Sequence, residues 1–209
     1  MKKTPPNKSV RLHKGSSMSI EYAILGLLSS RPLTGYDIKK MFEGSSVLYW
    51  SGNNNQIYTT LVKLHQNELV TREIETQEDR PARKIYSITA KGQEELKKWL
   101  LSEPEPPQLK NSFLVQLAWA DQLSPDELFG LLEKYEAEMQ MQLSMLLVQA
   151  QQGNRSTSKT PRDAYVNAAL ARTPREAVLW EMIQENWISF YQNELNWVRK
   201  LRKQLQDLG

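Results

Sequence analysis

Three stretches of the N-terminal half carry apolar side chains at the three- and four-residue spacing of one helical face. They cover residues 20–28, 35–42 and 54–66. Pro32 ends the first stretch because proline cannot continue a helix, and Thr34 offers an N-terminal cap to the second. We therefore predict three helices in succession.

The apolar period then changes to that of strands. Residues 69–75 and 84–89 are rich in β-branched side chains, and the polar segment 76–83 between them contains a proline, as a hairpin tip does. Thr89 is placed to cap a fourth helix. Three helices, a hairpin and a further helix within residues 18–102 predict a winged helix-turn-helix, so the fold class is mainly α with a small β wing.

The rest of the chain is predicted to be helical. Residues 1–17 are basic, without acids, and indicate a flexible arm before the folded part. Residues 103–110 are rich in proline, which indicates a stiff linker. Residues 111–209 repeat a helix-start signal of a Ser or Thr cap, a proline and an acid. We assign this part to a helical dimerisation domain.

The composition excludes several classes of protein. The chain has 0 cysteines and 2 histidines among 209 residues, so disulfides, thiolate metal sites and histidine-based triads lack their raw material. We therefore predict that the protein is not an enzyme and holds no metal or other cofactor. No apolar run suits a membrane span or a secretory signal, which predicts a cytoplasmic protein. The net charge of +3 permits a nucleic-acid partner without requiring one.

The third helix and the hairpin have the chemistry of a DNA-binding surface. The apolar stripe of the helix leaves polar side chains opposite, and a helix fits the major groove, where Asn and Gln read an adenine edge and Thr meets a thymine methyl. Cations on the hairpin suit backbone phosphates. The alternative is ordinary solvated surface, since acids interleave with those cations. The predicted DNA-binding residues are Asn53, Asn54, Asn55, Gln56, Thr59 and Lys63 on the helix, and Arg80, Arg83 and Lys84 on the wing.

The last predicted helix, which begins at Pro174, carries an apolar seam. Its apolar positions alternate steps of three and four residues, as in a coiled coil. Packing within the chain is the alternative for the upper part, whereas a lone chain offers little to pack against at the end. A partner helix is therefore favoured there. The predicted dimerisation residues are Trp187, Tyr191, Val198, Leu201 and Leu205.

Large aromatic side chains flank the predicted linker. Trp99 lies near the end of the fourth helix, and Trp119 lies on the first helix beyond the linker. Junctions between domains favour apolar pockets with a few polar groups, which Tyr22 and Gln116 would supply here. We therefore predict a small-molecule effector site at the junction. The alternative is that these tryptophans belong to the ordinary core.

These residues resemble the PadR-like transcriptional regulators. The resemblance is carried by Leu-Gly-Leu-Leu and Thr-Gly-Tyr-Asp within residues 22–43, by Ile-Tyr within residues 55–70, and by Arg-Lys-x-Tyr-x-x-Thr-x-x-Gly within residues 80–100. Residues 113–205 resemble, more loosely, the larger C-terminal domain of the subfamily that includes virulence activators.

The resemblance implies a winged helix, a homodimer made by the C-terminal helices and, in many members, repression relieved by small aromatic or drug-like ligands. It adds Tyr58 as a contact to the DNA backbone, and we include Tyr36 of the Thr-Gly-Tyr-Asp element in the DNA-binding set. The family usually has glycine where this chain has Glu68. We therefore expect Asn67 to take the left-handed conformation that ends the third helix.

The sequence thus predicts a sequence-specific regulator of transcription. We expect a homodimeric repressor, relieved by a small aromatic or drug-like ligand, whose partner is double-stranded DNA with a pseudo-palindromic operator. Two alternatives stay open: a winged-helix protein-interaction module that does not bind DNA, and a transcriptional activator. Affinity that falls steeply with salt distinguishes the DNA-binding protein, because phosphate contacts release counterions.

Overall fold

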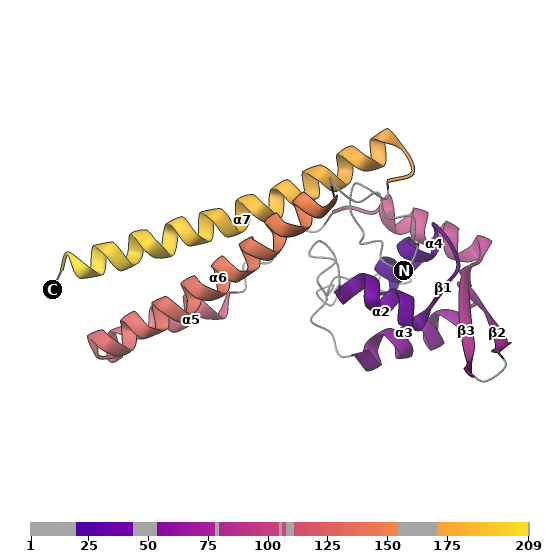
Figure 1. The fold of residues 1–209 in the computed structure, drawn as a ribbon, viewed down its shortest axis with the longest axis horizontal. Coiled ribbons are helices and arrows are strands. Elements are labelled where there is room, and N and C mark those ends of the chain that lie inside the picture. Colours follow the sequence, from indigo (N-terminus) through magenta and orange to yellow (C-terminus); the bar gives the residue numbers. More distant parts are fainter. Residues whose placement is uncertain are drawn as a thin grey trace, which may run out of the picture. The chain divides into compact units, whose positions relative to one another are not determined.

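The computed structural model describes residues 20–43, 54–77, 80–104, 106–107, 111–153 and 171–208. Its elements follow the predicted order with two additions, a short strand between the first two helices and a short 3-10 helix after α5 (Figure 1). The elements are α1 (Ile20–Leu28), β1 (Leu33–Thr34), α2 (Gly35–Glu43), α3 (Asn54–Gln66), β2 (Val70–Gln77), β3 (Arg80–Ile88), α4 (Ala90–Leu100), α5 (Ser112–Ala118), η1 (Ala120–Gln122), α6 (Pro125–Gly153) and α7 (Pro174–Gln206).

Contacts along the chain divide it into two units, which are described separately. The first unit combines residues 1–35 with 54–101 and holds α1, β1, α3, β2, β3 and α4. The second combines residues 36–53 with 102–209 and holds α2 after its first residue together with α5, η1, α6 and α7. The domain bounds expected from the sequence stay a prediction.

The core of the first unit is built from the predicted apolar stripes. On α1 the side chains of Ile20, Ile24, Leu25, Leu27 and Leu28 are buried. On α3 the buried apolar side chains follow the helical period, and α3 begins and ends at the predicted residues. Helix α1 contacts both α3 and α4. Burying one stripe of α3 leaves its other side to solvent, which positions the candidate site. The buried apolar side chains of α3 are Ile57, Leu61 and Leu64.

The three strands form an antiparallel sheet in the order β1-β3-β2. The predicted tip at residues 76–83 is too long, because the β2–β3 ladder continues to the pair Gln77 and Arg80. Polar residues and Pro81 shift the register between Glu75 and Gln77 but do not end the ladder. Strand β1 pairs with Ile85 and Tyr86 of β3, so among the described residues no strand pairs with that edge of β3 near Pro81, where a residue without an N–H is tolerated.

Helix α3 ends in a Schellman motif. The Leu69 N–H donates to the Leu64 carbonyl at 2.9 Å, and the Glu68 N–H donates to the His65 carbonyl at 3.0 Å. The left-handed residue is Glu68, with φ 61°, so the expectation that Asn67 would take this conformation is wrong. Partners distant in sequence hold Glu68 in place: its carboxylate pairs with Lys91 at 2.9 Å, and its carbonyl accepts a hydrogen bond from the hydroxyl of the α4 cap at 2.8 Å.

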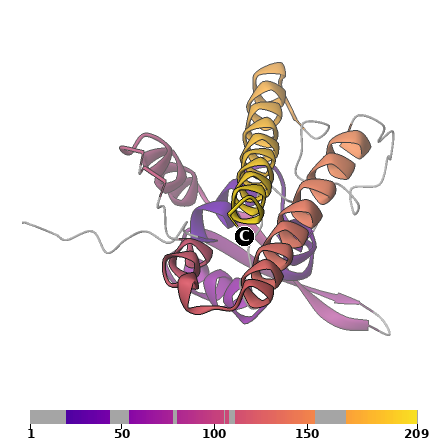
Figure 2. The same cartoon turned by 90° about the vertical axis from the view of Figure 1, so that its left-hand side faces the viewer.

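The second unit is centred on α6 and α7, which pack against each other along their length and run in opposite directions (Figures 1 and 2). The predicted start signals at Ser124 and Thr173 are confirmed as caps: Ser124 exchanges hydrogen bonds with Glu127, and the Thr173 hydroxyl accepts from the Glu176 N–H. The similar signal at Thr160 lies outside the described residues.

Apolar side chains from α5, α6 and α7 form the core of the second unit. Phe113, Leu132 and Val198 are buried together, and Leu201 and Leu205 pack against them. The premise that the end of α7 has little to contact within one chain is therefore wrong, because α5 and the first turns of α6 cover it.

A polar network supports this core. The Phe113 and Tyr135 rings stack with their centroids 3.6 Å apart. The Tyr135 hydroxyl donates to Glu194 at 2.5 Å, and burial together with this hydrogen bond raises the pKa of Tyr135 to about 12, so it stays a donor at neutral pH. Arg199 and Arg202 of α7 both pair with Glu136 of α6, at 2.7 and 3.0 Å.

Candidate nucleic-acid interface

The exposed side of α3 is polar. Asn55, Gln56 and Thr59 are exposed, as predicted, on the side opposite the buried stripe. Amide and hydroxyl groups of this kind suit the base edges of a major groove. Asn53 lies outside the described residues, and Asn54 begins α3 although its side chain is outside them.

Val62 adds an apolar group to this side of α3. Its side chain is 47% exposed, and it lies three residues after Thr59, which is one turn along the same face. The Thr59 hydroxyl donates to the Asn55 carbonyl at 2.7 Å, so its proton is already used within the helix. A methyl-bearing side chain between polar ones suits the C5-methyl group of thymine. Val62 was not among the predicted residues, although the helical period placed it opposite the buried stripe.

Tyr58 lies at the edge of this face and depends on a glycine. A Cβ atom on Gly35 would lie 2.6 Å from Cε1 of the Tyr58 ring, so only glycine allows the ring to approach the backbone there. The Tyr58 side chain remains 46% exposed. A half-exposed tyrosine held against backbone is suited to donating to a phosphate oxygen.

Lys63 is exposed on the same helix but is already paired. Its ammonium lies 2.5 Å from a carboxylate oxygen of Glu21 on α1. The hydrogen bond and the charge of Glu21 raise the pKa of Lys63 above its ordinary value, which favours the charged form. Lys63 was predicted to contact DNA, and its pairing with Glu21 was not predicted.

The register of the hairpin separates its charges onto two faces. Arg72 pairs with Tyr86 and Ile74 pairs with Lys84 across the β2–β3 ladder, so these side chains share the face that carries buried Val70 nearer the core. Arg72, Ile74 and Lys84 are exposed. Neither Arg72 nor Lys84 takes part in an ion pair among the residues that the structure describes. This basic face, with Arg72, Ile74 and Lys84, was only partly predicted, since Arg72 was missed.

The opposite face of the hairpin is acidic. Glu73 and Glu75 lie on it, and Arg83 stands across from Glu75 with its guanidinium 4.0 Å from the carboxylate. The predicted basic pair of Arg83 and Lys84 is therefore split between two faces, because neighbouring residues of a strand point to opposite sides. Arg80 begins β3, and its side chain lies outside the described part of the chain.

Tyr36 stands in the first turn of α2 with its side chain exposed. Helix α2 belongs to the second unit after its first residue, so Tyr36 is described apart from α3 and the hairpin. Its place in the DNA-binding set stays a prediction.

The predicted effector residues fall into two pairs. Tyr22 and Trp99 stack in parallel with ring centroids 4.6 Å apart in the first unit, and the Tyr22 hydroxyl donates to Glu95 at 3.4 Å. Burial, followed by the charge and the hydrogen bond of Glu95, raises the pKa of Tyr22. Gln116 and Trp119 lie in the second unit, and Trp119 is 69% exposed.

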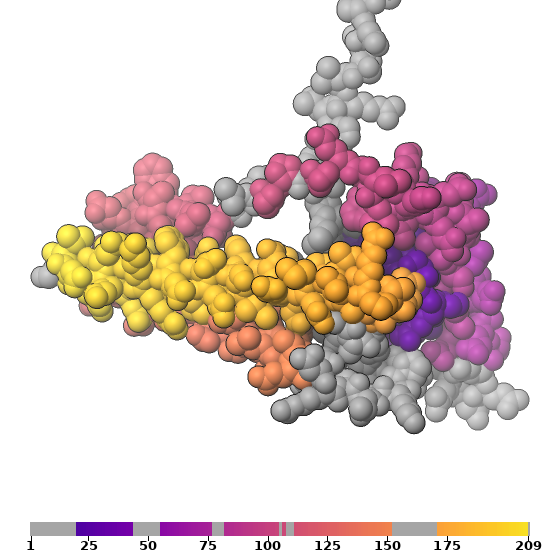
Figure 3. Space-filling model, turned by 90° about the horizontal axis from the view of Figure 1, so that it is seen from above, coloured from indigo at the N-terminus to yellow at the C-terminus, as the bar shows by residue number. Residues whose placement is uncertain are grey.

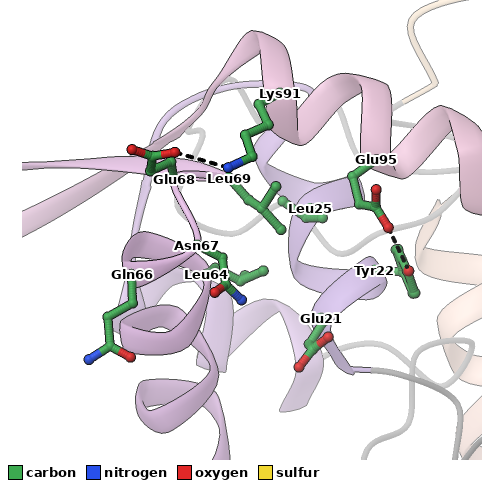
Figure 4. Close-up of a pocket in the computed structure, with 10 residues that line it drawn as sticks. All are labelled: Glu21, Tyr22, Leu25, Leu64, Gln66, Asn67, Glu68, Leu69, Lys91 and Glu95. Carbon is green, nitrogen blue, oxygen red and sulfur yellow. Dashed lines mark hydrogen bonds and ion pairs between the residues drawn. The ribbon is translucent and has the colours of Figure 1, made fainter.

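A pocket of about 510 Å³ lies beside Tyr22 in the first unit (Figure 4). Its lining is charged rather than aromatic. Glu95 hydrogen-bonds Tyr22, and Glu68 pairs with Lys91 across it. Such a lining does not suit an uncharged aromatic ligand, so the pocket adds no support to the predicted effector site. The pocket is lined by Glu21, Tyr22, Leu25, Leu64, Gln66, Asn67, Glu68, Leu69, Lys91 and Glu95.

The described residues lack a metal cluster and a membrane-spanning helix. Within them, no group of three or more His, Asp or Glu side chains is placed to hold a metal ion. None of the described helices is both long and apolar enough to cross a membrane.

Two family models together match most of the chain. Residues 24–98 match the transcriptional regulator PadR-like family, and residues 109–206 match the virulence activator alpha C-terminal domain. Over 128 residues the chain is 34% identical to the negative transcriptional regulator PadR of Bacillus subtilis, which covers 61% of this chain and 70% of PadR. The chain belongs to the PadR-like family. It is thus a transcriptional regulator and not an enzyme.

Solved structures of PadR-like regulators have the same fold. Bacillus subtilis PadR in complex with operator DNA matches with a TM-score of 0.69 at 25% identity, over 88% of this chain and 98% of that one. PadR in complex with p-coumaric acid matches with a TM-score of 0.65 at 24% identity, over 90% and 95%. The Vibrio cholerae virulence activator AphA matches with a TM-score of 0.68 at 22% identity, over 91% and 100%. The predicted winged helix followed by a helical domain is confirmed.

Proposed function

We propose that this PadR-like regulator binds double-stranded DNA sequence-specifically through α3 and the basic face of its wing. The observation that carries the proposal is the division of α3 into a buried stripe and an exposed side with amide, hydroxyl, methyl and ammonium groups. Such a side offers both base-edge and phosphate contacts. The solved complex of Bacillus subtilis PadR with operator DNA supports the same use of the fold here.

The residues divide by role. Asn55 and Gln56 read base edges, with Val62 against a thymine methyl. Tyr58, Arg72 and Lys84 contact phosphates, which fix the register without reading sequence. The proposed DNA-binding set also keeps, from the sequence alone, Asn53, Asn54, Arg80, Arg83 and Tyr36. On α3 it keeps Thr59 and Lys63.

Lys84→Ala and Arg72→Ala should each weaken binding to every duplex and lower the slope of log Kd against log salt by about 0.9 for each chain bound. Asn55→Ala should instead relax discrimination at one base pair, by about 1–3 kcal/mol. Fluorescence anisotropy with the upstream region of the protein's own gene and with a random duplex measures both effects. Lys97→Ala on α4 is the matched control, since it removes an exposed cation outside this surface. If Lys84→Ala and Lys97→Ala behave alike, the wing does not contact DNA.

We propose further that the regulator is a homodimer and a repressor. The interface draws on apolar side chains that α7 leaves exposed, and Figure 3 shows one face of α7 uncovered along the helix. Trp187 and Tyr191 flank exposed Phe190 on α7. Leu201 and Leu205 stay in the proposed interface because they are only partly buried, whereas Val198 supports it from inside the core. The exposed apolar residues of α7 are Val178, Leu179, Met182, Ile183, Phe190 and Trp197, and Leu208 is exposed just after the helix.

The same DNA titration tests the dimer. A two-fold symmetric protein binds a pseudo-palindromic operator with one chain per half-site, so sedimentation velocity should find two chains on each duplex. One chain per duplex at saturation would contradict the homodimer. Repression is read from a reporter fused to the bound upstream region, and increased expression with the regulator would make it an activator.

A small aromatic effector is proposed to relieve DNA binding, through Tyr22, Trp99, Gln116 and Trp119. The complex of Bacillus subtilis PadR with p-coumaric acid supports an aromatic acid as the first candidate. p-Coumaric acid should quench tryptophan fluorescence and weaken operator binding, and Trp99→Phe should remove part of the quenching. A ligand relieves repression only if it binds the DNA-incompetent arrangement better. If operator DNA does not change the quenching and the ligand does not change operator affinity, the two sites are not coupled.

The proposed site of action is the cytoplasm, where a regulator meets its DNA.

A further inference from the structure

The ion pair between Lys63 and Glu21 joins the proposed DNA-binding face to a helix outside it. Glu21 lies in the first turn of α1, and its side chain is 33% exposed, against 62% for Lys63. The ammonium and the carboxylate are 2.5 Å apart. Their helices contact each other through the core, so the two backbones are held in place. The pair is thus set by the fold rather than by a flexible loop.

The neighbouring carboxylates have other partners. Glu95 accepts a hydrogen bond from Tyr22, and Glu68 pairs with Lys91. Figure 4 shows Glu21 at the lower edge of the pocket, turned away from Tyr22 and Glu95. Glu21 is therefore the carboxylate that the first unit directs to α3.

We propose that Glu21 is an internal competitor of DNA phosphate for Lys63, which lowers the affinity of the regulator for the duplex backbone. The proposal rests on the DNA-binding function proposed above. A phosphate that takes Lys63 must displace the Glu21 carboxylate, which then stands uncompensated near the phosphate. If the ion pair between Lys63 and Glu21 stays intact on DNA, Lys63 contributes no counterion release. Both outcomes reduce the sequence-independent part of binding, so a larger share of the binding free energy comes from base contacts.

Glu21→Gln tests this, because glutamine keeps the shape and removes the charge. Binding of the full chain to a random-sequence duplex should tighten by about 2- to 5-fold at 0.1 M salt, the range expected of one exposed ion pair. The slope of log Kd against log salt should steepen by up to about 0.9 for each chain bound, the value for one further phosphate contact. Glu94→Gln on α4 is the matched control, since it removes one exposed negative charge outside the pair. It should change neither quantity by as much.

Two further variants test whether Glu21 acts on DNA binding through Lys63. In a Lys63→Gln background, Glu21→Gln should have no further effect, because the competitor then has nothing to compete for. Glu21→Asp keeps the charge and the acid in the first turn of α1 but withdraws the carboxylate by one methylene, so it should resemble Glu21→Gln. Circular dichroism of each variant checks that α1 is folded, and Glu21→Asp carries the test if Glu21→Gln does not fold.

The proposal is overturned if Glu21→Gln binds random duplex like Glu94→Gln. It is also overturned if the effect persists without Lys63, since the carboxylate would then repel phosphate directly. A parent protein that shows no salt-dependent binding to any duplex would instead overturn the proposed function. The two failures are distinguishable because the second is seen before any variant is made.

Discussion

Gly92→Ala is expected to lower the free energy of unfolding of the first unit by about 3 kcal/mol. A Cβ atom at this position would lie 2.1 Å from the Leu69 carbonyl oxygen and 2.9 Å from Cγ1 of Ile88. The Leu69 oxygen cannot yield easily, because it accepts a hydrogen bond from the Thr89 N–H at 3.0 Å and lies 3.1 Å from the Thr89 hydroxyl, whose proton it shares with the Glu68 carbonyl. The methyl group would therefore separate the end of α3 from the start of α4.

Urea-induced unfolding followed by circular dichroism measures this loss. Gly130→Ala is the matched control, since nothing lies within 4 Å of a Cβ atom there and the residue is inside α6. It should stabilise the protein by about 0.5–1 kcal/mol, because alanine loses less backbone entropy in a helix. Equal effects of the two variants would mean that the contact with Leu69 is not as close as described.

Leu132→Ala should destabilise the second unit by about 2–5 kcal/mol. The Leu132 side chain is 0% exposed and lies between Phe113 of α5 and Val198 of α7, so its loss leaves a cavity where three helices meet. Leu208→Ala is the control, because Leu208 is 83% exposed and should change stability by less than about 0.5 kcal/mol.

Differential scanning calorimetry separates the outcomes, since the loss should appear in the transition of the second unit. Truncation after residue 196 would remove Val198, Leu201 and Leu205 together. It should therefore unfold the second unit rather than yield a folded monomer. A shortened chain that keeps a cooperative second transition would contradict this account of the core.

Elements with a strong apolar period were predictable from sequence. Helix α3 has the predicted bounds because Ile57, Leu61 and Leu64 follow one helical face without interruption. The hairpin tip was not predictable in the same way, because polar residues and a proline can pair as well as turn. Glu68 takes the left-handed conformation because Thr89 and Lys91 hold it, and these partners lie more than twenty positions further along the chain.

In the candidate site, too, features set by one element were predictable and features set by contacts between elements were not. Exposure of Asn55, Gln56 and Thr59 followed from the helical period, because it depends on α3 alone. The partner of Lys63 did not, because it depends on how α1 packs on α3. The basic face of the wing needed the pairing of β2 with β3. Alternation along β2 already placed Arg72 and Glu73 on opposite faces of the strand, so Arg72 could have been predicted from the sequence.

The pairing of the wing limits how this hairpin can change in evolution. One residue inserted within β2 between Val70 and Arg72 would turn each later side chain to the other side of the sheet. Glu73 and Glu75 would then replace Arg72 on the face that carries Lys84, and the sign of that face would reverse. Length added at the tip, beyond the pair of Gln77 and Arg80, leaves the register unchanged. Relatives of this regulator can therefore vary the reach of the wing freely, while the strands that carry its charges are fixed in length.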